Sequence, residues 1–211
     1  LIYGGRAALE EVMLQAQGGS FPAFTRGGEV SSVTPAYVFN GRTLHSGDIL
    51  ISRGGAPTSA LIARGNDYPG NFSHVALLHV DDKTGVPGII ESHIEVGVVV
   101  STIEDYIKDK KLRVMVLRPR PDLAQMKADP MLPHKAAKRA YDEVKSRHIP
   151  YDFEMDYLEP SKWFCSEVAS WAYRQVGVEL WKGTTRMSAP GVVKWLSYFG
   201  VTHFETQAPA D

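Results

Sequence analysis

The stretch Asn71-Phe72-Ser73-His74-Val75-Ala76-Leu77-Leu78 begins with polar residues and continues as a run of aliphatic side chains. An aliphatic run of this length that follows a glycine-rich segment is typical of a buried β-strand, here expected over 73–80. Further short runs rich in valine, isoleucine and leucine cover 86–93, 96–101 and 112–117, with turn signals such as Asp81-Asp82-Lys83-Thr84-Gly85 between them. The sequence therefore predicts a small, mainly antiparallel sheet at the centre of the chain.

Towards the N-terminus, the spacing of apolar residues predicts a helix over 7–17, followed by a loop over 20–35. Gly47-Asp48 is a turn signal that leads into a strand over 49–52, after a shorter strand over 37–39. The segment 53–72 is rich in glycine and proline and is predicted to be a long loop.

Towards the C-terminus, the pattern is mostly helical. Helices are predicted over 102–107, 133–147 and 163–175, and a last helix has Ser188 as its cap, Pro190 in its first turn and Gly200 at its end. The residues after His203 are predicted to form a frayed end. This order of elements predicts an α+β fold in which helices pack on one side of the sheet.

Composition excludes several classes of protein. The chain has 211 residues, with 23 lysines and arginines against 24 aspartates and glutamates, so its formal net charge is −1. A protein that coats phosphate backbones needs a clear basic excess, and we therefore expect no nucleic-acid partner. No apolar run approaches the roughly 20 residues that a membrane helix requires, so we expect no transmembrane segment. Because the sequence begins with Leu1, we expect a processed N-terminus.

Cys165 is the single cysteine of the sequence, so it has no internal disulfide partner. It lies in Lys162-Trp163-Phe164-Cys165-Ser166-Glu167-Val168, at the predicted start of a helix. The unpaired N–H groups and the dipole of a helix N-terminus favour thiolate over thiol, and a backbone N–H beside the sulfur is suited to hold an oxyanion. A catalytic nucleophile and an inert buried cysteine are both open at this point.

A reactive thiol needs a base, and His74 is the leading candidate among the seven histidines because it begins a strand directly after the glycine-rich segment. His79 follows five residues later, so strand alternation places it on the opposite face. His134 and His148 flank a predicted helix and are expected to be solvated. The alternative for His74 is a satisfied histidine at a strand end.

A third group is needed to orient the imidazole. Glu91, His93 and Glu95 share one face of the next strand by period-two alternation, and Glu91 follows an apolar run. Which of Glu91 and His93 orients His74 stays open, as does a surface position for Glu91. His74, Glu91 and His93 also form a conceivable metal-ligand set, but the sequence has no His-Glu-x-x-His or comparable spacing. We predict no metal and no cofactor.

Five segments in a fixed order resemble the permuted NlpC/P60 family, in particular its YiiX/YebB-like branch. They are Gly47-Asp48-Ile49-Leu50, Phe72-Ser73-His74-Val75-Ala76-Leu77, Ile89-Ile90-Glu91-Ser92, Tyr151-Asp152-Phe153 and Trp163-Phe164-Cys165-Ser166-Glu167-Val168. In ordinary NlpC/P60 enzymes the cysteine helix precedes the histidine strand, whereas here the histidine comes first. The resemblance implies a circularly permuted papain-like NlpC/P60 fold over 44–204, with an N-terminal helix and loop extension over 1–43 and a tail over 205–211.

The resemblance also implies roles for individual residues. Cys165 matches the nucleophile, His74 the base that takes the thiol proton, and Glu91 the group that orients the histidine. Tyr151 matches a tyrosine that lines the site near the thiol. Ser166 and Ser73, beside the cysteine and the histidine, are further candidates for contact with substrate or oxyanion.

The predicted function is therefore a cysteine hydrolase, a peptidase or amidase that cleaves an amide bond through a thioester acyl-enzyme. The family's best-known substrates are cell-wall peptides cut beside γ-D-glutamyl residues, which favours a bacterial periplasmic or envelope location. Two alternatives stay open, namely an acyltransferase or lipid/N-acyl amide hydrolase with the same Cys-His-Glu chemistry, and a non-catalytic binding module. The aromatic residues that we consider for the pocket are Tyr68, Phe72, Trp163, Phe164 and Trp181, most of which we expect in the core.

Overall fold

A computed structural model describes Gly5, Ala8, Leu9 and Val12, all helical, and then residues 30–67, 70–109 and 111–209. The rest of the helix predicted over 7–17, most of the loop predicted over 20–35, and Tyr68 lie outside the described residues. The strands are β1 Ala36–Phe39, β2 Arg42–His45, β3 Ile49–Gly54, β4 His74–Val80, β5 Pro87–His93, β6 Gly97–Ser101, β7 Lys111–Leu117, β8 Thr185–Arg186 and β9 Glu205–Thr206. The helices are α2 Pro57–Arg64, α3 Ile103–Lys108, α4 Ala124–Ala128, α5 Leu132–Ser146, α6 Cys165–Arg174 and α7 Pro190–Tyr198.

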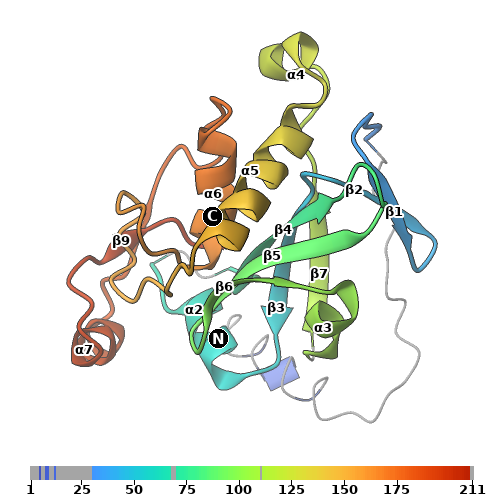
Figure 1. Ribbon diagram of the computed structural model, residues 1–211. Helices are drawn as coiled ribbons and strands as arrows, with labels where there is room; N and C mark the ends of the chain where they lie inside the picture. The colour runs from blue at the N-terminus through green and yellow to red at the C-terminus, as the bar shows by residue number, and fades with distance from the viewer. Residues whose placement is uncertain are drawn as a thin grey trace.

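The centre of the fold is a five-stranded antiparallel sheet in the order β6-β5-β4-β3-β7 (Figure 1). The predicted strands in the central block all form, within one or two residues of their expected ends. β4 lies in the middle of the sheet, where Ser52 of β3 pairs with His74 and Glu91 of β5 pairs with Ala76. The register therefore brings residues 74 and 91, which are 17 positions apart in sequence, to the same end of two neighbouring strands.

The two faces of the sheet are covered differently. Helices α5 and α6 pack on one face, where Val75, Leu77 and Ile90 join the larger hydrophobic core. The opposite face carries Ala76 and Leu78 and is covered by α3 and the β1–β2 hairpin (Figure 1). The prediction of helices on one side of the sheet is thus wrong for α3, because the second apolar face of the strands also needs cover.

The Gly47-Asp48 turn, which precedes β3, packs against the start of α5 and is hydrogen-bonded to the residue after β7. Gly47 has a φ of 96°, and a Cβ at this position would lie 2.3 Å from the Cβ of Pro133 at the start of α5. Only glycine permits this approach at this backbone conformation. Asp48 is buried and accepts hydrogen bonds from Arg118 Nε and Nη2, both at 2.7 Å. The motif therefore joins β3 to α5 and to the end of β7.

Three further expectations from the sequence are wrong. The segment predicted as a long loop over 53–72 contains helix α2, which begins with proline at its first position. Residues 204–209 do not form the frayed end that the sequence predicts. Strand β9 pairs with β8, and Thr206, Gln207 and Ala208 are buried. Ser188 does not cap α7, since its hydroxyl donates to Asp67 instead. Among the described residues, no helix is both long and apolar enough to cross a bilayer.

Candidate active site

His74 and Glu91 meet at the end of the central sheet. The Nε2 atom of His74 lies 2.9 Å from the Oε2 atom of Glu91. Glu91 is buried, whereas the His74 side chain keeps 19% of its surface exposed at the end of β4. With Nε2 occupied by the carboxylate, the other ring nitrogen of His74, Nδ1, is the one that is available to the thiol.

Glu91 holds a second histidine as well. Its Oε1 atom lies 3.3 Å from Nε2 of His93, and the centroids of the two imidazole rings are 5.9 Å apart. Burial would raise the pKa of the Glu91 carboxyl, but the hydrogen bonds from His74 and His93 and the charge on His74 hold it well below its usual range. Glu91 is therefore the group in contact with His74, and His93 contacts the far oxygen of the same carboxylate.

Cys165 is the first residue of α6, as its sequence position predicts. Two long-range hydrogen bonds fix the chain just before it, because Ser92 Oγ donates to the Trp163 carbonyl at 2.7 Å and the Trp163 amide donates to the Pro150 carbonyl at 3.1 Å. Ser92 follows Glu91 in β5. One strand therefore supplies the carboxylate on one face of the sheet and anchors the start of the cysteine helix on the other.

The electrostatics of the pair favour an ionised thiol. Burial raises the pKa of Cys165, but a hydrogen bond to His74, the charge on His74 and the Val75 amide outweigh it, so the thiol pKa falls below its ordinary value. Burial likewise lowers the pKa of His74, but hydrogen bonds to Cys165 and Glu91 and their charges raise it to about 9. Opposite shifts of this kind favour a thiolate–imidazolium pair over a neutral thiol and imidazole.

The three predicted residues for contact with substrate or oxyanion have different surroundings. Burial and the nearby Cys165 charge raise the pKa of Tyr151, which therefore carries its proton as a hydrogen-bond donor near the sulfur. Ser166 is fully buried, and its hydroxyl contributes to the lowered pKa of Cys165. Ser73 Oγ accepts from the Gly54 amide at 3.3 Å and donates to the Ser52 carbonyl at 3.4 Å. Ser73 thus joins β4 to β3, which leaves its predicted substrate contact without support.

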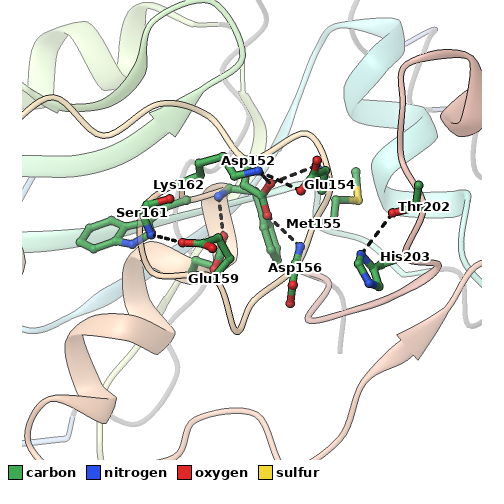
Figure 2. A network of polar contacts seen from close by, with 12 residues as sticks. Asp152, Glu154, Met155, Asp156, Glu159, Ser161, Lys162, Thr202 and His203 are labelled. Carbon is green, nitrogen blue, oxygen red and sulfur yellow. Dashed lines mark hydrogen bonds and ion pairs between the residues drawn. The ribbon is translucent and has the colours of Figure 1, made fainter.

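A polar network braces the loop that connects Tyr151 to Cys165 (Figure 2). The buried Asp152 accepts hydrogen bonds from the amides of Glu154 at 3.0 Å and Asp156 at 2.7 Å. The Lys162 Nζ atom lies 3.6 Å from Asp152 and 2.9 Å from Glu154, so it joins the two ends of the loop. Because Asp152 directly follows Tyr151, the network fixes the backbone beside the thiol.

The remaining candidates lie away from the thiol or in the core. Trp163 and Phe164 are buried, and Phe72 and Trp181 pack against the larger core, as expected for most of the aromatic residues. His79 stacks on Tyr141 of α5 with ring centroids 4.5 Å apart, on the face predicted for it. The expectation of a solvated His134 is wrong, because its ring is buried and its Nδ1 lies 2.9 Å from Ser46 Oγ.

Two groups at the site were not singled out from the sequence. The Val75 amide contributes to the lowered thiol pKa, and no residue-type pattern identifies a backbone group. Glu167 accepts a hydrogen bond from the Phe164 amide at 2.8 Å. Its position three residues after the helix cap is the local signal that identifies it.

Comparison with known proteins identifies a family and a similar fold. The family described as permuted papain-like amidase, YaeF/YiiX, C92, matches residues 43–194. A crystal structure titled as the metalloprotein yiiX from Escherichia coli O157:H7 has a similar fold, with a TM-score of 0.56 and 18% sequence identity. The similarity covers 78% of this chain and 88% of that chain. No curated protein matches the sequence.

Proposed function

This chain belongs to the C92 family of permuted papain-like amidases and is a cysteine hydrolase; we propose that Cys165 is its nucleophile, His74 its general acid–base group and Glu91 the residue that orients His74. One observation carries the assignment, namely that the only cysteine and a carboxylate-bound histidine contact each other with opposite pKa shifts. A merely buried cysteine has a raised pKa, not a lowered one.

The proposed reaction has two steps. The Cys165 thiolate attacks the carbonyl carbon of an amide, and the carbonyl electron pair moves to the oxygen. When the tetrahedral intermediate collapses, His74 donates its proton from Nδ1 to the departing amine nitrogen, which leaves a thioester on Cys165 and a neutral imidazole. His74 then removes a proton from a water molecule that attacks the thioester, and the sulfur departs as thiolate beside the re-formed imidazolium.

The oxyanion of each step needs hydrogen-bond donors. The Tyr151 hydroxyl keeps its proton near the sulfur, and the first amides of α6 have no partner within the helix. Both are suited to developing negative charge on the carbonyl oxygen. Glu91 does not exchange protons in this scheme. Its strongly lowered pKa keeps it ionised, so it stabilises the imidazolium and fixes the ring.

For the substrate, we propose a cell-wall-type peptide with a γ-D-glutamyl linkage and a free amino group. The turn between β5 and β6 carries Glu95, which is exposed and close enough for its charge to raise the Tyr151 pKa. An exposed carboxylate whose charge acts on Tyr151 favours a cationic amine over an uncharged chain end. We also propose that the C92 family is related to the wider NlpC/P60 family, since that relationship is what suggests the γ-D-glutamyl linkage.

An acylated lipid or N-acyl amide is the second candidate. Phe153 is 45% exposed and lies edge-on to Tyr151, with ring centroids 5.0 Å apart. An exposed aromatic ring beside the proposed oxyanion donor is suited to an acyl chain.

A metal-dependent reaction is not part of the proposal, although the similar structure is titled a metalloprotein. His74 and His93 contact different oxygens of Glu91, at 2.9 and 3.3 Å, and the Glu91 carboxylate lies between them. Over residues 30–67, 70–109 and 111–209, no group of three histidine, cysteine, aspartate or glutamate side chains is arranged to hold a metal ion. The donor set therefore does not fit a metal at this site.

The test is a search by mass spectrometry for an acyl adduct on Cys165 after separate exposure to cell-wall peptides and to acyl lipids. An adduct of peptidyl mass supports the first substrate class, and an acyl-chain mass supports the second. The Cys165→Ala variant is the control, since any adduct that persists in it is not on the nucleophile. Turnover of either pool by Cys165→Ala would overturn the proposed mechanism.

A further inference from the structure

The N-terminus of α6 lacks the usual type of capping residue, which is serine, threonine, aspartate or asparagine. Its cap position is Phe164, whose side chain has no oxygen to accept a hydrogen bond from the first turn. The Phe164 residue is buried, with 4% of its surface exposed, so its amide needs a partner within the protein. This amide directly precedes the proposed nucleophile.

Glu167 supplies the partner. Its Oε2 atom accepts the Phe164 amide hydrogen at 2.8 Å, and the Glu167 amide donates in turn to the Phe164 carbonyl at 3.1 Å. The side chain is 3% exposed, which is rare for a glutamate. We propose that Glu167 is a positioning residue, whose carboxyl oxygen holds the first turn of α6 in the orientation that sets the Cys165 thiol against His74. This inference rests on the proposed role of Cys165.

The surroundings indicate that Glu167 acts as a neutral acceptor. Burial raises its pKa to about 9, and the charges of Asp152 and Asp156 act in the same direction. The Phe164 amide and the Arg174 charge act in the opposite direction but do not compensate. A neutral carboxyl keeps the acceptor oxygen and adds no second negative charge beside the thiolate.

The two possible charge states of Glu167 give opposite predictions. If Glu167 is a neutral acceptor, Glu167→Gln keeps the hydrogen bond and leaves the thiol unchanged, whereas Glu167→Ala removes the bond and weakens the contact between Cys165 and His74. If Glu167 is an ionised group, both variants remove a negative charge near the sulfur, and both favour the thiolate.

The experiment is the pH dependence of Cys165 alkylation by iodoacetamide, which needs no substrate. We expect Glu167→Gln to follow the wild type, and the midpoint of the alkylation profile of Glu167→Ala to lie about one pH unit higher, which is a tenfold slower reaction at any pH below both midpoints. Glu167→Asp keeps the carboxyl but is one methylene shorter, and should resemble Glu167→Ala. It keeps the test valid if the alanine variant does not fold.

Ser170→Ala is the matched control, because Ser170 is buried one turn further along α6. It should lower the melting temperature without moving the alkylation profile. Unchanged profiles in Glu167→Ala and Glu167→Asp, faster alkylation in both Gln and Ala variants, or equal loss in both would each overturn the inference. A wild-type thiol with an ordinary pKa of about 8.5 would instead contradict the proposed nucleophile itself.

Discussion

His74 and His79 lie five residues apart on the same strand, and their pKa values shift in opposite directions. The pKa of His74 rises to about 9, whereas burial and the neighbouring His134 and Lys138 lower that of His79 to about 4. Both rings are desolvated, which by itself disfavours the charged form. The difference is that His74 contacts Glu91 and Cys165, while His79 is stacked between rings on the α5 face.

The comparison teaches that burial does not make a histidine catalytic. The neighbouring groups determine the direction of the pKa shift, and strand alternation determines which neighbours each ring contacts. One end of β4 carries the His74–Glu91 pair that we propose for catalysis, and the other end carries His79 in a neutral stack of rings that packs β4 on α5. Each of the following experiments either breaks this contrast or measures it.

The largest effect should come from removing the thiol. Cys165→Ala is expected to lower turnover by about 10³-fold or more, because the covalent step is lost. The variant should remain folded, with a melting temperature near that of the wild type. The measurement is amine release from the substrate pool that labels Cys165, with circular dichroism as the control for folding.

The histidine pair gives the sharpest contrast. His74→Gln should abolish turnover and raise the thiol pKa to about 8.5 or above, because the imidazolium no longer stabilises the thiolate while the sulfur stays buried. His79→Gln should keep turnover within about threefold of the wild type, since it affects only packing against α5. Alkylation and turnover are measured for both. Equal losses in the two variants would show that the contrast between the two ends of β4 is false.

The carboxylate should matter less than either partner of the ion pair. Glu91→Gln is expected to reduce turnover by about 10- to 100-fold, since orientation is kept in part while the charge is lost. Without that charge, the His74 pKa falls, so the alkaline limb of the pH profile should move down from about pH 9. If Glu91→Ala is silent while His93→Ala is not, the orienting residue has been assigned to the wrong side chain.

Acid should destabilise the packing end of β4. A histidine whose pKa is lower in the folded state loses stability as pH falls from about 6.5 towards 4, because the unfolded chain then binds more protons. His79→Gln should remove about 2 kcal/mol of this acid sensitivity, or roughly 4–8 °C in melting temperature between pH 7 and pH 4.5. His74 has the opposite sign: its contribution to stability is complete below about pH 6.5 and is lost as pH rises through about 9.

The smallest effect should come from chelation. EDTA is expected to leave both turnover and the alkylation profile of Cys165 unchanged, because the Cys–His–Glu chemistry requires no metal. The wild type is assayed before and after dialysis against the chelator, followed by addition of zinc. A loss that zinc restores would contradict the reaction as proposed.

Much of the fold follows from local patterns in the sequence. The strands around His74 and Glu91, the helix at 102–107 and the position of Cys165 at a helix start all form near their predicted bounds. Strand alternation and helical spacing are local patterns, so they predict strands and helices without any knowledge of tertiary contacts. The prediction of a loop over 53–72 is wrong for α2, because the glycines and prolines around this short helix dominate the local pattern.

The candidate site was predictable to the level of residue types. A single cysteine at a helix start and a histidine at the start of a strand are enough to propose Cys165 and His74, whereas Glu91 as the third member is implied by the family resemblance. The sequence does not distinguish Glu91 from His93 as the residue that orients His74, since both lie on the same face of one strand. The structure places His93 on the second oxygen of Glu91, which is a matter of side-chain direction and depth rather than of pattern.

The sequence by itself determined the order of most elements, the single possible thiol and the opposite strand faces of His74 and His79. Only the tertiary structure decided the burial of His134, the hydrogen bond from Phe164 to Glu167, and the approach of Pro133 to Gly47. The physical reason is that periodicity fixes which way a side chain points along one element. Its pKa, its partners and its burial depend on segments that are distant in sequence and meet only when the chain folds.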